Sequence, residues 1–239
     1  MSIRVPLTAL AEGVRVLDAK SAHYLVRVLR LRAGDAFEAF DAGVECDGEV
    51  VHEDGETVTV RLGAPRSARL HATREITWIH GLPKGDKTSA IVQDATELGA
   101  TVVVFVETAR SVVRLDPAKR AERAARLQKV GEEAARQCGR GDVPRVLIAA
   151  SLEDALAEAP AEARRFVLYE SATVPLRDKL PAEGPLAFLV GPEGGFDPSE
   201  VTLAEGRGFE SVSLGAFVLR TETVPAAVLG GIRILGTPG

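Results

Sequence analysis

Cysteine is scarce in this 239-residue chain, in which only Cys46 and Cys138 are present. The two lie far apart and form no Cys-x-x-Cys pair, so they indicate neither a zinc site nor a disulfide framework. The four histidines form no His-x-His or His-x-x-x-His pattern, and the chain has no Gly-x-Ser-x-Gly elbow. We therefore expect no metal site, and the sequence argues against a serine hydrolase.

Long apolar runs are also missing. None approaches the roughly 18 residues that a membrane-spanning helix needs, and the first residues carry no apolar segment of the signal-peptide type. Hydrophobic residues make up 46% of the chain and charged residues 26%, as is typical of a globular protein. We therefore expect a cytoplasmic protein without a membrane partner.

The excess of acidic residues argues against a nucleic-acid partner, but basic residues gather in three stretches. The net charge is −5, whereas binding to phosphates needs clustered Lys and Arg. Residues 110–145 nevertheless hold ten basic and five acidic residues, which gives a local charge of +5. Residues 20–32 and 61–74 each hold four basic residues and no acid. One such stretch is typical of a solvated face, whereas three in an acidic chain favour a polyanionic partner.

Residues 1–70 predict a small β-barrel domain with one helix. Three short, β-branched or alternating segments are typical of strands, namely 35–40, 45–52 and 57–62. Residues 21–31 have the period of a helix, with Val28 on its apolar face and Arg27 and Arg30 together on another. The polar, basic segment 63–72 is interpreted as a linker.

Residues 74–239 predict an α/β domain in which strands and helices alternate. The predicted strands are 76–80, 101–107, 165–169, 186–190 and 211–214, and the clearest predicted helices are 86–98, 117–137 and 224–235. This order indicates a mostly parallel sheet that is covered on both faces. Such sheets bind ligands beyond the carboxyl ends of their strands. We therefore expect the chemistry in the loops after Tyr169, Val190 and Leu214.

The segment 81–88, Gly-Leu-Pro-Lys-Gly-Asp-Lys-Thr, superficially resembles a phosphate-binding P-loop. Only three residues separate its glycines, and Asp86 stands before Lys87. A P-loop needs four residues between its glycines, followed directly by Lys and Ser or Thr. We interpret the segment as a strand-to-helix turn, in which Lys84 remains a candidate for contact with an RNA phosphate.

The strongest local signal is Gly-Pro-Glu-Gly-Gly at 191–195, which follows an apolar strand. After it, Asp197 as N-cap, Pro198 and Glu200 form a capping-box pattern that starts a helix. The glycines let the backbone approach a ligand without obstruction by a Cβ, and Glu193 is an acid on a stiffened turn. A purely structural turn needs one glycine and no particular acid, so the pattern favours ligand binding.

A second segment, Leu-Arg-Thr-Glu-Thr at 219–223, again stands between a strand and an apolar helix. Arg220 and Glu222 flank Thr221. The alternative interpretation is helix capping by a threonine, which fits Pro225 in the first helical turn. Capping explains the threonines but does not require an arginine next to a glutamate.

Taken together, these segments resemble a known family. The matching residues are His23 with Val-Leu-Arg at 28–30, Gln-Asp-Ala-Thr-Glu-Leu-Gly at 93–99, Gln-Cys-Gly-Arg at 137–140 with Pro144, Leu-Val-Gly-Pro-Glu-Gly-Gly at 189–195, and Leu-Arg-Thr-Glu-Thr at 219–223. In order and spacing they resemble the RsmE-type 16S rRNA uridine-N3 methyltransferases of the SPOUT superfamily. Each segment is weak alone, whereas five in register are specific.

The resemblance implies an N-terminal PUA-like barrel, a C-terminal SPOUT domain with a trefoil knot, and a homodimer with active sites at its interface. It also implies S-adenosylmethionine as cofactor and a uridine of the small-subunit 16S rRNA as substrate. Three loops are then expected to hold the cofactor, through Leu168, Tyr169, Glu170, Val190, Gly191, Pro192, Gly194, Gly195, Leu214, Gly215, Val218, Leu219 and Thr221.

Two positions depart from the family pattern. Arg136 stands where the family usually has an acid, which argues against an acid–base role at that helix end. Val224 and Pro225 stand where a small residue usually follows, which alters the helix start but leaves Arg220 and Glu222 in place.

Methylation at uridine N3 defines the roles that the site must fill. Negative charge builds on the flanking carbonyl oxygens, so we expect Arg220 or Arg140 to stabilise it. Glu193 and Glu222 are candidates for a base or an orienting group. The residues expected to contact RNA are His23, Arg27, Arg30, Lys84 and Arg136. The alternatives are a SPOUT enzyme that acts on another rRNA or tRNA nucleotide, and a non-catalytic RNA-binding protein.

Overall fold

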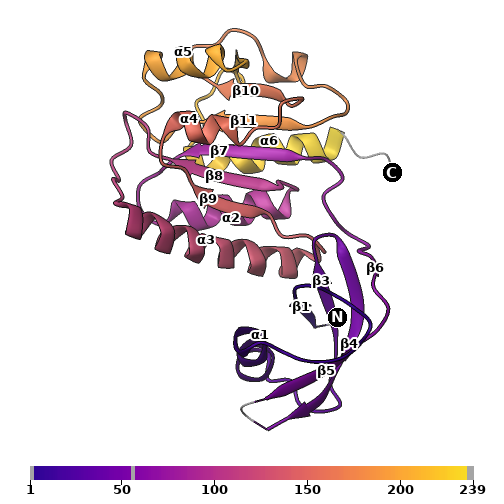
Figure 1. Cartoon of the computed structure of the whole chain (residues 1–239). Coiled ribbons are helices and arrows are strands. Elements are labelled where there is room, and N and C mark those ends of the chain that lie inside the picture. The colour runs from indigo at the N-terminus through magenta and orange to yellow at the C-terminus, as the bar shows by residue number, and fades with distance from the viewer. Residues whose placement is uncertain (1–2, 55–56, 236–239) are drawn as a thin grey trace. The chain divides into compact units, whose positions relative to one another are not determined.

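The computed structural model describes residues 3–54 and 57–235, so the outermost residues of the two predicted domains, 1–2 and 236–239, lie outside it. The chain divides into two compact units (Figure 1). The first consists of Met1–His71 together with Ala135–Val143, and the second of Ala72–Ala134 and Pro144–Gly239. None of the helices in the described part of the chain is both long and apolar enough to cross a membrane.

The first unit is built on a six-stranded sheet. Its strands are β1 (Arg4–Pro6), β2 (Gly13–Val16), β3 (Ala36–Asp41), β4 (Val44–Glu53), β5 (Val58–Leu62) and β6 (Arg66–Ser67). They pair in the order β1-β3-β4-β5-β2, with β6 added on β4, and every pair except β1–β3 is antiparallel. The core under the sheet includes Val5, Leu25, Phe37, Val50 and Val60. The three strands predicted in this region are confirmed.

The interpretation of residues 63–72 as a linker is wrong in part, because the segment contains β6. A fully buried carboxylate, Glu45 on β4, attracts Arg66 of β6 with an Nε–Oε1 distance of 3.4 Å. It also attracts Arg4 of β1, with an Nη1–Oε2 distance of 3.5 Å. Ion pairs with Glu45 therefore help to hold the short strands β1 and β6 in the sheet, and the sequence of β6, Arg-Ser, carries no hydrophobic signal.

The predicted helix at 21–31 differs from the observed one. Helix α1 (Ala19–His23) begins earlier, and one π-helical turn, η1 (Tyr24–Val28), ends it. Because the wider π turn shifts the helical register, Val28 is 56% exposed and not on the buried face. Arg30 lies beyond the helix with a positive φ of 60°. Its proximity to Arg27 therefore does not follow from helical spacing, although both side chains are exposed.

The second unit contains a six-stranded sheet in which all pairs are parallel, as the sequence predicted. Its strands are β7 (Ile76–Gly81), β8 (Val102–Val106), β9 (Arg145–Ile148), β10 (Arg164–Leu168), β11 (Leu186–Val190) and β12 (Phe209–Val212). Its helices are α2 (Lys87–Glu97), the larger part of α3 (Pro117–Cys138), α4 (Leu152–Ala157), α5 (Pro198–Gly206) and α6 (Val224–Leu235), with short 3-10 turns η2 (Leu176–Asp178) and η3 (Thr221–Thr223). The short strand β9 was not predicted.

Helices cover both faces of this sheet (Figure 1). Because side chains alternate along a strand, Trp78 and Phe188 pack into one core with α2, α3 and α6, whereas Ile79 and Leu189 pack into another with α4 and α5. Buried, apolar strands of this kind are typical of parallel sheets. The sheet is thus the rigid middle layer from whose edge the loops project.

The strand order β12-β10-β11-β7-β8-β9 places β11 between β7 and β10. The chain runs from β7 outward to β8 and β9, and then returns to the other side of the sheet. The change of direction leaves a crevice at the carboxyl ends of the central strands, where ligands bind in open α/β sheets. Leu168 and Val190, the last residues of β10 and β11, lie opposite each other in the parallel pairing of these two strands.

The helix that follows the 191–195 loop begins with the predicted cap. The Asp197 side chain accepts a hydrogen bond from the Ser199 backbone N–H at 3.0 Å, and the Glu200 side chain accepts one from the Asp197 N–H at 2.9 Å. Glu200 also accepts a 2.7 Å hydrogen bond from the Ala109 N–H, which joins the start of α5 to the loop after β8. The cap therefore fixes the far end of the glycine-rich loop.

We expect Asp197→Ala to lower the free energy of unfolding by about 1 kcal/mol, because α5 loses its N-cap acceptor. Asp197→Asn keeps an acceptor at the same position and is expected to stay within a few tenths of a kcal/mol of the wild type. Urea unfolding followed by circular dichroism measures both. Equal stability of the alanine variant and the wild type would show that the cap contributes nothing.

Candidate active site

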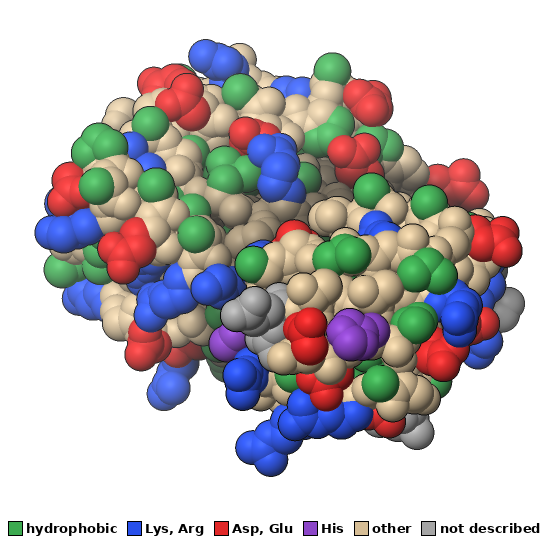
Figure 2. Space-filling model, turned by 60° about the horizontal axis from the view of Figure 1, so that its bottom comes forward, with side chains coloured by type: hydrophobic (Ala, Val, Ile, Leu, Met, Phe, Trp, Pro, Cys, Tyr) green, Lys and Arg blue, Asp and Glu red, His purple; other side chains and the backbone are tan. Residues whose placement is uncertain are grey.

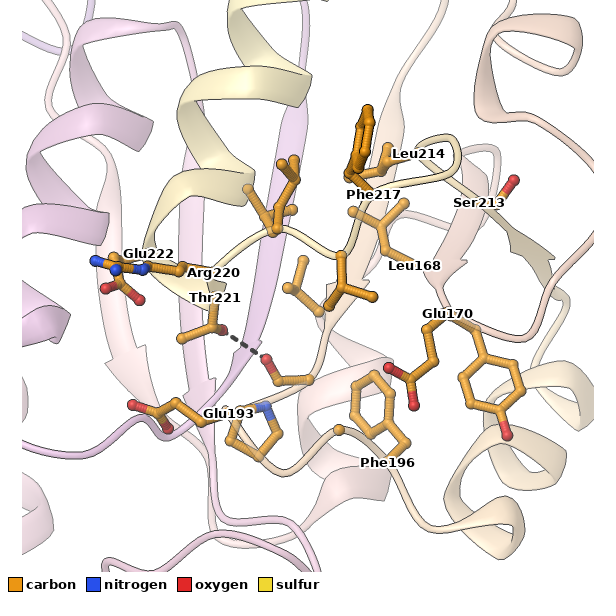
Figure 3. Close-up of a pocket in the computed structure, with 18 of the residues that line it drawn as sticks. Leu168, Glu170, Glu193, Phe196, Ser213, Leu214, Phe217, Arg220, Thr221 and Glu222 are labelled. Atoms are coloured by element: carbon orange, nitrogen blue, oxygen red, sulfur yellow. Dashed lines mark hydrogen bonds between the residues drawn. The ribbon is translucent and has the colours of Figure 1, made fainter.

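A cavity of about 590 Å³ opens at the carboxyl ends of β10, β11 and β12 (Figure 3). Each of these strands contributes its last residue, Leu168, Val190 or Val212, to the lining. The three loops that follow form most of the walls, and Lys87 of α2 and Val224 of α6 complete them. The cavity thus lies where the parallel sheet predicted the chemistry.

The structure brings together most of the residues predicted to hold a cofactor. Among the described residues, the cavity lining includes Leu168, Tyr169, Glu170, Val190, Gly191, Pro192, Gly195, Leu214, Gly215, Val218, Leu219 and Thr221. Gly194 is the exception, because it faces Arg110: a Cβ on Gly194 would lie 3.1 Å from the Arg110 Cβ. Residues from three chain segments therefore share one cavity.

The 191–195 loop needs its glycines for two reasons. Gly195 donates a hydrogen bond to the Pro192 carbonyl at 2.9 Å and adopts a φ of +67°, the left-handed region that favours glycine. Gly191 lies so close to this turn that a Cβ would be 3.2 Å from the Gly195 backbone. On the neighbouring strand, a Cβ on Gly81 would be 2.4 Å from the Pro192 Cδ. The loop is therefore a tight turn packed against β7.

The segment 219–223 is joined to this loop by one hydroxyl group. The Thr221 Oγ1 donates to the Gly191 carbonyl at 2.7 Å, as the dashed line in Figure 3 shows. The same oxygen lies 2.7 Å from Nε2 of the fully buried His80 on β7. The alternative interpretation of Thr221 as a helix cap is therefore wrong, because its hydroxyl bonds to the Gly191 carbonyl and His80 and not to a backbone N–H at the helix start.

A lysine that the sequence analysis missed lies between two glutamates of the site. The Lys87 Nζ is 2.9 Å from a Glu193 carboxylate oxygen and 3.0 Å from one of Glu222. The Lys84 backbone N–H also donates to the Glu193 carboxylate at 3.2 Å. Lys87 is the first residue of α2, which follows β7 after a short turn, and its place at the functional edge of the sheet was the available signal.

These ion pairs shift the pKa values of all three groups. The hydrogen bonds that Lys87 donates to Glu193 and Glu222 raise the pKa of Lys87. Burial raises the pKa of Glu193, but hydrogen bonds from Lys87 and backbone N–H groups outweigh it, so the pKa lies below its ordinary value. The pKa of Glu222 is lowered mainly by its own backbone N–H, and further by Lys87. Both glutamates are therefore ionised at neutral pH and are weak bases.

The charged side chains lie at two ends of the cavity. Figure 3 shows Arg220, Glu222 and Glu193 at one end, and Glu170 with Ser213 at the other. Between them the 214–219 loop contributes apolar side chains, of which Phe217 is 87% and Val218 79% exposed. The cavity thus offers an apolar middle, exposed glycine backbone and polar groups at each end, as binding sites for small molecules usually do.

Arg140, the other arginine proposed for catalysis, is not among the described residues that line the cavity. It belongs to the first unit, where it is buried and forms an ion pair with Asp142. In the same unit the guanidinium of Arg136 lies 5.2 Å from the centre of the Tyr24 ring, and burial lowers its pKa. These contacts hold both side chains within the first unit.

The other residues predicted to contact RNA are exposed. They are His23, Arg27 and Arg30 in the first unit and Lys84 in the second. Basic and acidic side chains are interspersed on the face of the molecule in Figure 2. Within the described residues, no group of three or more His, Cys, Asp or Glu side chains is arranged to hold a metal ion.

Comparison with known proteins identifies the family. Residues 71–233 match the model of an RNA methyltransferase domain, and residues 17–63 match that of an RNA methyltransferase PUA domain. The ribosomal RNA small subunit methyltransferase E of Bacillus subtilis is 32% identical over 229 residues, covering 90% of this chain and 88% of the relative. The chain belongs to this RNA methyltransferase family.

Solved structures agree with this assignment over nearly the whole chain. Ribosomal RNA small subunit methyltransferase E from Neisseria gonorrhoeae, bound to S-adenosylmethionine, has a TM-score of 0.88 at 29% identity. A methyltransferase from Legionella pneumophila in complex with the same cofactor has a TM-score of 0.86 at 26% identity. Both comparisons cover 98% of each chain. The resemblance to RsmE-type enzymes is therefore confirmed.

We expect Gly81→Ala to destabilise the protein by about 1–3 kcal/mol, because the new methyl group would overlap Pro192 and displace the 191–195 loop. Gly206→Ala is the matched control, since a Cβ there meets nothing within 4 Å. The control is expected to leave stability unchanged or to raise it by up to about 1 kcal/mol. Urea unfolding compares the two, and equal stability of both variants would contradict the close contact.

Proposed function

We propose that this protein is an S-adenosylmethionine-dependent methyltransferase that methylates N3 of a uridine in 16S rRNA within the small ribosomal subunit. The observation that carries the proposal is the cavity, in which the loops after three adjacent parallel strands meet. Family membership and the two similar structures, which bind the cofactor, support it. Such an enzyme acts in the cytoplasm, where ribosomes are made.

The residues of the cavity fit the proposed cofactor. A volume of about 590 Å³ is in the usual range for small-molecule sites. Leu168, Val190 and Leu214 offer an apolar surface to an adenine ring, and Glu170 can accept hydrogen bonds from ribose hydroxyls. The glycines at 191 and 195 leave backbone groups accessible. When bound, S-adenosylmethionine supplies an electrophilic methyl group on a sulfonium.

In the proposed reaction, residues of this protein orient the uracil base and stabilise the negative charge that develops on it. The N3 proton passes to solvent water, and its loss places negative charge on the flanking carbonyl oxygens, one of which a guanidinium can stabilise by donating hydrogen bonds. Of the two arginines considered, we propose Arg220, because it lines the cavity whereas Arg140 is paired with Asp142. The remaining catalytic effect is positioning.

Glu193 and Glu222 are proposed as orienting groups. The sequence left open whether either acts as a base. Their lowered pKa values make them poor proton acceptors, since an effective general base has a pKa near the working pH. Their ion pairs with Lys87 instead hold that lysine, the start of α2 and the 191–195 loop together.

We further propose the finer features of the family for this chain. The six-stranded sheet of the first unit is the PUA-like barrel of a domain at 1–70, and its exposed His23, Arg27 and Arg30 contact RNA, as do Lys84 and Arg136. Residues 74–239 form a SPOUT domain with a trefoil knot. The contact of Thr221 with Gly191 and that of Arg233 with the Glu97 carbonyl, at 2.7 Å, support a threaded C-terminal segment.

We also propose a homodimer, which the family resemblance implies. Exposed apolar side chains gather in the C-terminal part of the second unit, where Phe217, Val218 and Ile234 are 87%, 79% and 81% exposed. Large exposed apolar side chains of this kind are typical of protein interfaces. A second copy of the chain is the partner that the family resemblance implies.

The activity is tested with small ribosomal subunits from cells that lack the modification, incubated with the protein and isotope-labelled S-adenosylmethionine. We expect one methyl group at N3 of one uridine, seen as a stop of reverse transcription because N3 lies on the Watson–Crick edge. Calorimetry is expected to show binding of the cofactor alone. A methyl group on a ribose or on tRNA would indicate a different SPOUT activity, and no binding of cofactor would indicate an RNA-binding protein without catalysis.

We expect Arg220→Ala to lower kcat by about 100- to 1,000-fold, the usual effect of removing one donor to a developing negative charge. The dissociation constant for S-adenosylmethionine, measured by calorimetry, should change less than about threefold. Arg220→Lys keeps the charge but not the paired donors, so its kcat should lie between the other two. Full turnover of the alanine variant with intact cofactor binding would remove Arg220 from the mechanism.

A further inference from the structure

A buried chain of hydrogen bonds runs from the centre of the sheet to the cavity. The Trp78 Nε1–H donates to the His80 Nδ1 at 3.1 Å. The His80 Nε2 and the Thr221 Oγ1 are 2.7 Å apart, and the Thr221 Oγ1 is 2.7 Å from the Gly191 carbonyl oxygen. Trp78 and His80 are fully buried, and Thr221 is 6% exposed. Trp78 and His80 stand two apart on β7, so they share a face of the sheet.

The indole N–H at one end of this hydrogen-bond network and the carbonyl at the other determine the direction of every bond in it. An indole nitrogen can only donate, so the His80 Nδ1 must accept and carries no proton. A neutral imidazole then has its proton on Nε2, which donates to the Thr221 oxygen. A carbonyl oxygen can only accept, so the Thr221 hydroxyl donates to Gly191. The tautomer of His80, usually a matter of assignment, is here fixed by its partners.

We propose that His80 is a positioning residue, which as its Nε2–H tautomer holds the 219–223 segment against the 191–195 loop and so sets the width of the cofactor cavity. This inference rests on the proposed function in that S-adenosylmethionine occupies the cavity. His80 does not line the cavity itself and acts through Thr221, which does, together with Gly191.

Burial protects the required protonation state. A charged imidazole would place an N–H opposite the indole N–H, donor against donor. Burial lowers the pKa of His80 to about 3, and the charges of Glu193 and Glu222, which act in the opposite direction, do not offset it. These hydrogen bonds are therefore retained at any pH at which the enzyme is expected to work.

Two substitutions distinguish the hydrogen bond at Nδ1 of His80 from the one at Nε2. In His80→Gln the side-chain amide reaches the place of Nε2 and can donate to Thr221, but nothing accepts from Trp78. In His80→Asn the amide oxygen takes the place of Nδ1 and accepts from Trp78, but the side chain is too short for Thr221. Both side chains are neutral and polar, so a general cost of altering the core affects both.

Calorimetry with S-adenosylmethionine is the first readout. His80→Gln is expected to bind within about twofold of the wild type, whereas His80→Asn should lose about five- to tenfold in affinity, the value of one net hydrogen bond. Thr221→Val removes the hydroxyl and with it the bonds to both His80 and Gly191, so it should bind at least as weakly as His80→Asn. Equal affinities of the two His80 variants would overturn the proposal.

Nuclear magnetic resonance gives a second readout that does not depend on the cofactor. Trp78 is the sole tryptophan of the chain, so its indole N–H signal needs no assignment. That signal should shift in His80→Gln and stay in place in His80→Asn, the reverse of the order in affinity. Backbone amide signals of 191–195 and 219–223 should move in His80→Asn alone, and their invariance would overturn the proposal. If these shifts occur but the wild type binds no S-adenosylmethionine, the proposed function fails and the positioning role stands.

Discussion

The hydrogen bond between the Thr221 hydroxyl and the Gly191 carbonyl is the constraint on which the site depends. It joins two loops that lie 30 residues apart in the sequence and that follow different strands of the sheet. It is the direct hydrogen bond between the 219–223 segment and the glycine-rich turn, and Lys87, which pairs with both Glu193 and Glu222, links them indirectly. Both segments line the cavity, so the hydrogen bond that joins them also affects the shape of the cavity.

The other residues of the cavity form its walls or hold the charged groups at one end of it. Backbone and apolar side chains of the 168–170, 190–195 and 214–219 loops form the walls, and the ion pairs of Lys87 with Glu193 and Glu222 fix the end where Arg220 stands. Backbone N–H groups and these ion pairs hold both carboxylates in the charged state, which is suited to orientation and unsuited to proton transfer. Charge stabilisation is therefore proposed for Arg220, and proton removal is not assigned to either glutamate.

The sequence predicted the elements that have a strong periodic or capping signal. The parallel sheet, the capping box at Asp197 and the start of α6 with Pro225 followed from local patterns, and so did the edge at which the cavity lies. Strand β6 was missed because ion pairs with a buried glutamate take the place of apolar side chains. Lys87 and His80 were missed because their partners are remote in sequence, at 193, 222 and 221, so that only the folded chain brings them together.

We propose that S-adenosylmethionine binds in the cavity at the ends of β10, β11 and β12. A crystal structure of the protein grown with the cofactor tests this most directly. We expect density for the cofactor between the 191–195 and 214–221 loops, with the Thr221–Gly191 hydrogen bond retained. Cofactor density at any other place, or an empty cavity at saturating cofactor, would contradict it.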